Sequence, residues 1–171
     1  MATLAGIENI LLFRIEGEEG SAWKLAYQTE HELTETRDFE TTETKDGAES
    51  SAGAYEGSFS ASSLMAQDDE YVSELKEIVR ERNPRKVHVW DIETDGVDQE
   101  GVSTIPGDYA LCNLTDFTKS SPVDGNVELS LDFTITGRPY SGEVDVTPEL
   151  LAIIRSIDED REFIQPMETA E

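Results

Sequence analysis

The chain has 171 residues, of which 37% are hydrophobic, so it is long enough to form one domain with a buried core. Thirty-eight acidic residues against thirteen basic ones give a net charge of −25, which excludes binding to nucleic acid through its phosphates, because that affinity comes from Lys and Arg. No apolar run approaches the roughly 18 residues of a membrane span, and the first residues lack the features of a secretory signal.

Two strands are predicted before residue 34. Residues 10–16 form the first, and the stretch "GEEGS" ends it in a turn. Residues 23–33 alternate between apolar and polar side chains, which predicts a strand with one buried face. The buried row contains Trp23, Leu25, Tyr27, His31 and Leu33, and the polar row contains Lys24, Gln28, Glu30 and Glu32. We expect His31 to be a core histidine with its hydrogen bonds satisfied, rather than a metal ligand.

The next stretch, "ETRDFETTETKDG", is charged and rich in threonine, with nothing that resembles a core, a nucleophile or a metal site. Two interpretations stay open: a mobile loop, or a segment that becomes ordered against something outside its own chain. Alternation then resumes in "AYEGSFSASSL", which predicts another strand. One face carries Tyr55, Gly57, Phe59 and Ala61, and the other carries Glu56, Ser58, Ser60 and Ser62.

A helix is predicted over residues 68–83. Its apolar stripe has helical spacing, with acidic residues at the N-terminus, arginines at the C-terminus and Asn83-Pro84 as the stop. The stripe contains Tyr71, Val72, Leu75, Ile78 and Val79.

Strands return after the helix. "KVHVWDIE" forms one, residues 94–106 form a Gly- and Asp-rich loop, and "DYALCNLTDF" forms the next. After the turn "SSPVDGN", the stretch "NVELSLDFTITG" alternates most clearly. Its apolar row is Val127, Leu129, Leu131, Phe133 and Ile135, and its polar row is Glu128, Ser130, Asp132 and Thr134. The fold class is therefore mainly β (α+β): an antiparallel sandwich or partial barrel with one helix packed on a face.

The C-terminal part differs from the rest of the chain. Thr147 is a helix N-cap residue and Pro148 suits the first helical position, so a short C-terminal helix begins here. The final stretch "REFIQPMETAE" is predicted to be an arm or a disordered end.

Catalytic and metal-binding signals are weak. Cys112 is the only cysteine and lies in an apolar stretch, so we expect a buried structural residue, with neither a disulfide nor a thiolate zinc site. His31 and His88 are the only imidazoles, and no nucleophile motif, phosphate loop or metal spacing is present. Asp-Gly pairs at Asp46, Asp95 and Asp124 indicate turns better than calcium ligands. The sequence favours a structural or interaction protein without enzymatic activity, cofactor or metal.

The acidity itself has more than one interpretation. High net charge keeps a protein soluble. The chain has only five lysines beside many acidic residues, a bias that also suits the high-salt cytoplasm of a halophilic host, because salt screens the self-repulsion. The charge alone therefore decides neither source nor function.

The order of these elements resembles the major tail protein, or tail tube, family of long-tailed siphophages, in its TP901-1-like branch. The resemblance runs from about Ala2 to Pro139 and is most specific at "TKDG", the small-residue run after it and "YEGSFSASSL". The helix after an acidic pair and the closing "VELSLDFTITGRP" support it. About thirty further C-terminal residues depart from the family pattern.

The resemblance implies a structural virion protein of the tail, assembled in the host cytoplasm. Its subunits are expected to form hexameric rings that stack into a tube, with a continuous inner β-barrel around a negatively charged lumen that conducts viral DNA without binding it specifically. Expected partners are copies of itself, the tape measure protein, the tail terminator and the distal tail or baseplate proteins, with no membrane insertion. The domain covers residues 1–139, with the helix at 68–83 and an inter-ring arm at 35–54, and residues 140–171 form a C-terminal extension.

The same resemblance supplies the candidate site residues. We expect the arm to be ordered by assembly, with a disordered linker as the alternative. Its candidates are Arg37, Asp38, Phe39, Thr41, Thr42, Lys45, Asp46 and Gly47. For the lumen wall, the alternative is an ordinary outer surface. The lumen candidates are Glu56, Ser58, Ser60, Glu128, Ser130 and Asp132.

Two rival functions stay open. An acidic DNA mimic would also present carboxylates, as a monomer or dimer that binds a basic protein. A stacked-ring tube of a contractile or secretion system shares the expected fold.

Overall fold

A computed structural model of the chain describes residues 9–18, 20, 22–24, 28–65, 70–94, 103–148 and 150. The predictions for Leu25, Tyr27, most of the loop predicted at 94–106, and the C-terminal helix and tail beyond residue 150 lie outside these residues. In the described part, no helix is long and apolar enough to cross a membrane.

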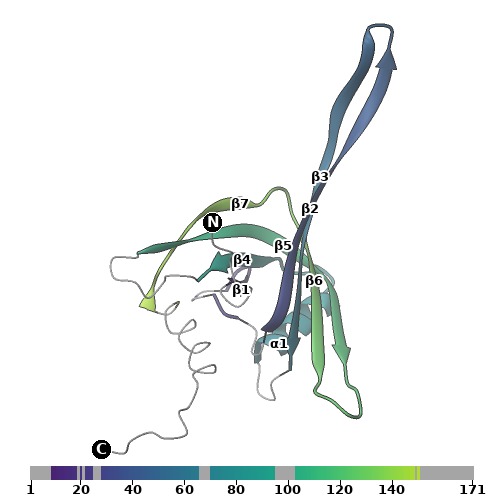
Figure 1. Cartoon of the computed structure of the whole chain (residues 1–171). Coiled ribbons are helices and arrows are strands. Elements are labelled where there is room, and N and C mark those ends of the chain that lie inside the picture. Colours follow the sequence, from purple (N-terminus) through teal and green to yellow (C-terminus); the bar gives the residue numbers. More distant parts are fainter. Residues whose placement is uncertain are drawn as a thin grey trace, which may run out of the picture.

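The described strands form one antiparallel sheet with a single helix against it (Figure 1). The elements are β1 Asn9–Ile15, β2 Gln28–Thr44, β3 Gly47–Leu64, α1 Glu70–Arg80, β4 Val87–Glu93, β5 Thr104–Ser120, β6 Glu128–Ile135 and β7 Tyr140–Asp145. The strand order is β1-β4-β5-β6-β3-β2, and β7 also pairs with β5. The predicted mainly β, antiparallel fold with one packed helix is confirmed.

The sheet has two parts, and β5 is long enough to belong to both. Its N-terminal half lies between β4 and β7, and residues 112–120 pair with β6. The C-terminal half of β5 therefore forms a four-stranded part with β6, β3 and β2. The prediction of a loop up to Pro106 was wrong at its end, because Thr104–Pro106 pair with β7. β7 itself lies in the C-terminal extension and was not predicted.

The main core lies between the helix and the sheet. Phe13 stacks on Phe133 with ring centroids 5.3 Å apart, and Trp23 covers Phe13 at 5.4 Å. From α1, the side chains of Val72, Leu75 and Ile78 are buried, whereas Tyr71 and Val79 at the edges of the predicted stripe are partly exposed. Cys112 is buried as predicted, and burial raises the pKa of its thiol to about 12.

A second apolar cluster explains why the "ILLF" run of β1 is buried on both faces. It contains Ile10, Leu12, Ile92, Ile105 and Leu150. Leu150 is held there by the predicted N-cap, because its backbone N–H donates to Thr147 Oγ1 at 3.2 Å. The C-terminal extension is thus attached to the sheet at its start.

Trp23 does not begin the long strand predicted from it. It makes an isolated bridge with Phe13, and β2 begins at Gln28. The ring of Tyr71 stacks on Trp23 at 4.2 Å. Backbone hydrogen bonds with Phe13 and side-chain packing against Tyr71 therefore fix this residue outside β2.

Candidate functional site

One face of the four-stranded part is polar from edge to edge. Its residues form rows across the strands, because directly paired residues of antiparallel strands share a face. One row runs Asp116, Asp132, Ser60 and Glu32, and the next runs Thr118, Ser130, Ser62 and Glu30. These two rows hold four carboxylates and no basic side chain, so this face has a strongly negative potential.

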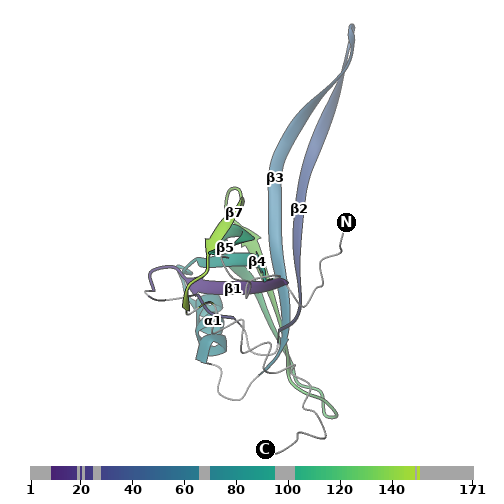
Figure 2. The ribbon, with the colours of Figure 1, turned by 60° about the vertical axis from the view of Figure 1, so that its left-hand side comes forward.

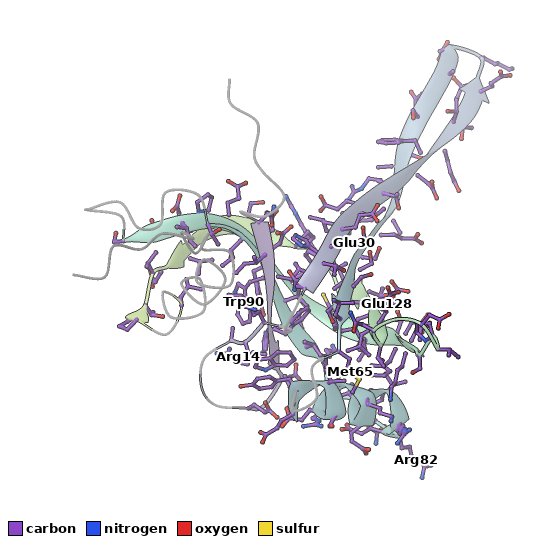
Figure 3. The ribbon with its side chains drawn as sticks, turned by 60° about the horizontal axis from the view of Figure 1, so that its bottom comes forward. Arg14, Glu30, Met65, Arg82, Trp90 and Glu128 are labelled. Carbon is purple, nitrogen blue, oxygen red and sulfur yellow. The ribbon has the colours of Figure 1, made fainter. Side chains whose placement is uncertain are left out.

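The structure brings the six lumen candidates onto this polar face. Ser58, Ser60 and Glu56 alternate along β3 with the buried Phe59, and Glu128, Ser130 and Asp132 alternate along β6 with the buried Leu131 and Phe133. Glu56 lies on the same face of β3, two residues before Ser58, and pairs with Thr36 of β2. Figure 3 shows Glu128 and Glu30 on this part of the sheet. Their role in a lumen stays a prediction.

Sequence reasoning missed the outer strands of this face. Glu30 and Glu32 were predicted to lie on the polar face of their strand, but they were not included among the lumen candidates. Asp116 was hidden by a β-bulge between Leu114 and Asp116, which interrupts the alternation of β5. The alternation of polar and apolar residues along β2 could have indicated that Glu30 and Glu32 belong to this face.

Both side edges of the four-stranded part lack a strand partner within the described residues. β2 ends the strand order, and residues 113–120 of β5 pair with β6 on one side only. An edge strand presents unpaired N–H and C=O groups and is a template for pairing with another chain. A polar face bounded by two such edges is suited to lateral assembly.

The charged segment is a long β-hairpin that extends from the body (Figures 1 and 2). β2 and β3 pair with each other as far as Thr44 and Gly47, and Lys45 and Asp46 form the turn. Gly47 has φ of 126°, which favours glycine, and the hydroxyl of Thr44 donates to its carbonyl at 2.7 Å. The segment is thus a hairpin paired within its own chain rather than an irregular loop, and its contact with a neighbouring ring stays a prediction.

The arm has two different faces. Phe39 lies opposite Ala52, and Thr41 lies opposite Ser50, so this face is small or apolar up to Glu43, which lies opposite Ala48 near the tip. The other face carries Glu40 opposite Ser51 and Thr42 opposite Glu49. Phe39 is 65% exposed, the only such aromatic residue among the arm candidates in the described chain.

Further arm candidates take defined positions on the hairpin. Arg37 lies at its base opposite Tyr55, and Asp38 lies at the bulge that follows. Gly53 permits this bulge, because a Cβ there would lie 2.8 Å from the carbonyl oxygen of Asp38.

The two histidines are engaged in hydrogen bonds within the body. His31 Nε2 lies 3.0 Å from Asn9 Oδ1 and 3.2 Å from Asp91 Oδ1. His88 Nδ1 lies 2.6 Å from the hydroxyl of Tyr109, and burial lowers the pKa of His88. The described residues contain no group of three or more side chains suited to a metal ion.

Comparison with known proteins agrees with this geometry. A family model described as phage tail tube protein matches residues 3–141. A putative tail protein of Staphylococcus phage phiMR25 is 26% identical over 136 residues, which are 79% of this chain and 69% of that protein.

Two solved structures show the same fold. The SPP1 tail tube has a TM-score of 0.73 at 16% identity, with 99% of this chain and 95% of that chain covered. The tail of an empty gene transfer agent particle with C6 symmetry has a TM-score of 0.61 at 12% identity, with 82% of this chain and 99% of that chain covered.

Proposed function

Because this chain belongs to the phage tail tube protein family, we propose that it is the tube subunit of a virion tail and assembles into hexameric rings that stack around a DNA channel. The observation that carries this proposal is one acidic face bounded by two edge strands that have no strand partner in the described part of the chain. Six-fold symmetry is that of the related tail of the gene transfer agent particle.

Ring closure follows from the two edges. β2 of one subunit pairs with residues 113–120 of β5 in its neighbour, and repetition around the ring closes the sheets into a barrel. Closure satisfies the backbone groups of these two edges, so that neither remains a template for uncontrolled pairing. The apolar face of each sheet packs on α1, so the polar face lines the lumen.

The wall suits the passage of DNA. Glu30, Glu32, Asp116 and Asp132 repel phosphate, and the serines and threonines between them offer no positive charge. DNA therefore passes without specific binding. This role is structural and requires no catalytic group.

The arm extends between rings. Its side chains bury no part of the subunit core, so its length is explained by a contact outside the subunit. At the tube ends we propose contacts with a terminator and with distal tail or baseplate proteins, and inside the lumen with a tape measure protein.

Negative-stain microscopy of the purified protein tests this function. We expect rings or hollow tubes, and we expect both to be lost in Lys119→Pro. Lys119 pairs with Leu129 at a position where its backbone N–H faces away from β6, and proline removes this donor from the free edge of β5. A monomer or dimer that binds a basic protein and never forms rings would contradict the proposal and favour a DNA mimic. A sheath around the tubes in virions would assign them to a contractile system.

A further inference from the structure

A cleft lies at the base of the arm, where β2 and β3 leave the body and the β6–β7 connection passes beside them. Its volume is about 840 Å³. The lining residues are Glu35, Arg37, Tyr55, Asp108, Arg138, Pro139, Tyr140 and Ser141, and we call it the base cleft.

Tyr55 forms a fixed wall of the base cleft. Its hydroxyl donates to Glu35 Oε1 at 2.6 Å. The ring lies over Gly57, where a Cβ atom would meet the Tyr55 hydroxyl at 2.5 Å, so glycine is needed for this packing. The cleft is therefore shaped by the subunit itself.

The base cleft holds two guanidinium groups, of Arg37 and Arg138, beside the carboxylates of Glu35 and Asp108, which accept hydrogen bonds from hydroxyl groups. The guanidinium of Arg37 lies 5.9 Å from the centre of the Tyr55 ring, and Arg138 is exposed in the β6–β7 connection. Within the described residues, neither guanidinium has a carboxylate oxygen within 4.0 Å. Tyr140 is 67% exposed beside them. What the cleft offers to a ligand outside the subunit is therefore two guanidinium groups without an ion-pair partner in the described residues, and an aromatic surface, although two carboxylates also line it.

The opposite end of the same strands carries a complementary feature. β6 runs from the β5–β6 turn at one end of the sheet to the Arg138 connection at the arm end (Figures 1 and 2). In that turn, Val123 is 100% exposed and is followed by the exposed carboxylate of Asp124. An apolar side chain next to an anion matches the aromatic and cationic lining of the base cleft.

We propose that the base cleft of one subunit binds the Val123–Asp124 turn of a subunit in the adjacent ring. The proposal rests on the proposed function, because it requires stacked rings. Two different complementary surfaces at opposite ends of a subunit form a heterologous contact, which repeats without closing and so builds a filament. The Asp124 carboxylate accepts charge-assisted hydrogen bonds from Arg138 or Arg37, and Val123 packs on Tyr140.

Two charge reversals test this pairing. Arg138→Glu places an anion opposite Asp124, and Asp124→Arg places a cation opposite Arg138. We expect each variant to lower the amount of tube recovered by sedimentation at least tenfold. The double variant restores the pair with reversed polarity and regains tubes. Arg82→Glu is the control, because Arg82 lies beyond the end of α1 and points away from the body (Figure 3).

Mixing the two single variants gives a sharper test. A ring of Arg138→Glu subunits is complementary at both ends to a ring of Asp124→Arg subunits. Alternating rings therefore stack, and we expect the mixture to form tubes although neither variant does so alone. Folding of each variant is checked by its thermal unfolding, with Val123→Ser as a milder variant that changes no charge.

Each outcome decides a separate question. Single variants that form tubes as the wild type does would overturn the pairing, as would single variants that lose tubes without rescue in the double variant or the mixture. Wild-type protein that never forms tubes would overturn the proposed function, and the cleft assignment with it.

Discussion

Asp116 of β5 and Asp132 of β6 lie directly opposite each other on the polar face of the sheet. Like charges at directly opposed positions of an antiparallel pair destabilise the sheet. The isolated subunit therefore gains no stability from this pair. The proposed role of this face as the lining of the lumen explains why two acidic residues occur at these positions.

Replacing one member of this pair should stabilise the subunit. We expect Asp132→Asn to raise the free energy of unfolding by about 0.2–1 kcal/mol at low salt, because a cross-strand repulsion is removed. The gain should shrink in 1 M salt, where screening acts beyond about 3 Å. Urea titrations at both salt concentrations measure it. Asp124→Asn in the exposed turn is the control and should change stability little.

A cation on the polar face should make the lumen attract DNA. Ser130 lies between Ser62 and Thr118, so a lysine at this position has no directly paired carboxylate to neutralise it. We expect Ser130→Lys subunits to form tubes in which DNA ejection stalls, and added salt to relieve the stall. Glu128→Lys and Asp132→Lys together should act in the same direction, although Asp116 faces residue 132 and offsets part of the added charge. Ejection at the wild-type rate in low salt would place Ser130 outside the channel.

The arm should be needed for assembly and dispensable for folding. Residues 41–51 are exposed, so replacing them with a short Gly-Ser linker removes no buried side chain. We expect a folded monomer with a melting temperature within a few degrees of the wild type and no tube formation. Light scattering and thermal unfolding give both readouts. A variant that unfolds, or one that polymerises normally, would contradict the inter-ring role.

Glu74 should make the subunit less stable as the pH rises. Burial, and then the nearby Glu18 carboxylate, raise the pKa of Glu74 above its ordinary value of 4.5. Between these two pKa values the native state binds more protons than the unfolded state, so stability falls with rising pH. We expect Glu74→Gln to be more stable than the wild type at pH 7, with a difference that vanishes below about pH 4.5.

Local patterns in the sequence predicted most of this fold. Alternation placed Phe59, Leu131 and Phe133 in the core and put the six lumen candidates on one face. Helical spacing predicted α1, and Thr147 capped the helix start as its residue type indicated. These features depend on residues that are close together in the chain, so a single sequence is enough to predict them.

Long-range pairing explains what could not be predicted. The sequence of the arm resembles a polar loop, because a hairpin that is exposed on both faces has no apolar alternation. Only the pairing of β2 with β3 makes this segment a strand. β7 is short and largely exposed, and its partner in β5 lies more than thirty residues away. The base cleft combines β2, β3, β5, β7 and the β6–β7 connection, so no local motif indicates it.

Salt should favour assembly of this protein. A subunit with a net charge of −25 repels its neighbours, and stacked rings concentrate that charge. Exposed charges are screened beyond about 10 Å at 0.1 M salt and beyond about 3 Å at 1 M. One guanidinium–carboxylate contact per subunit is a small attraction against this general repulsion. We therefore expect tubes to form more readily as salt rises, with monomers in low salt, and light scattering across a salt series measures it. Tubes that dissociate in concentrated salt would mean that intersubunit ion pairs dominate, and the acidity would then need another explanation.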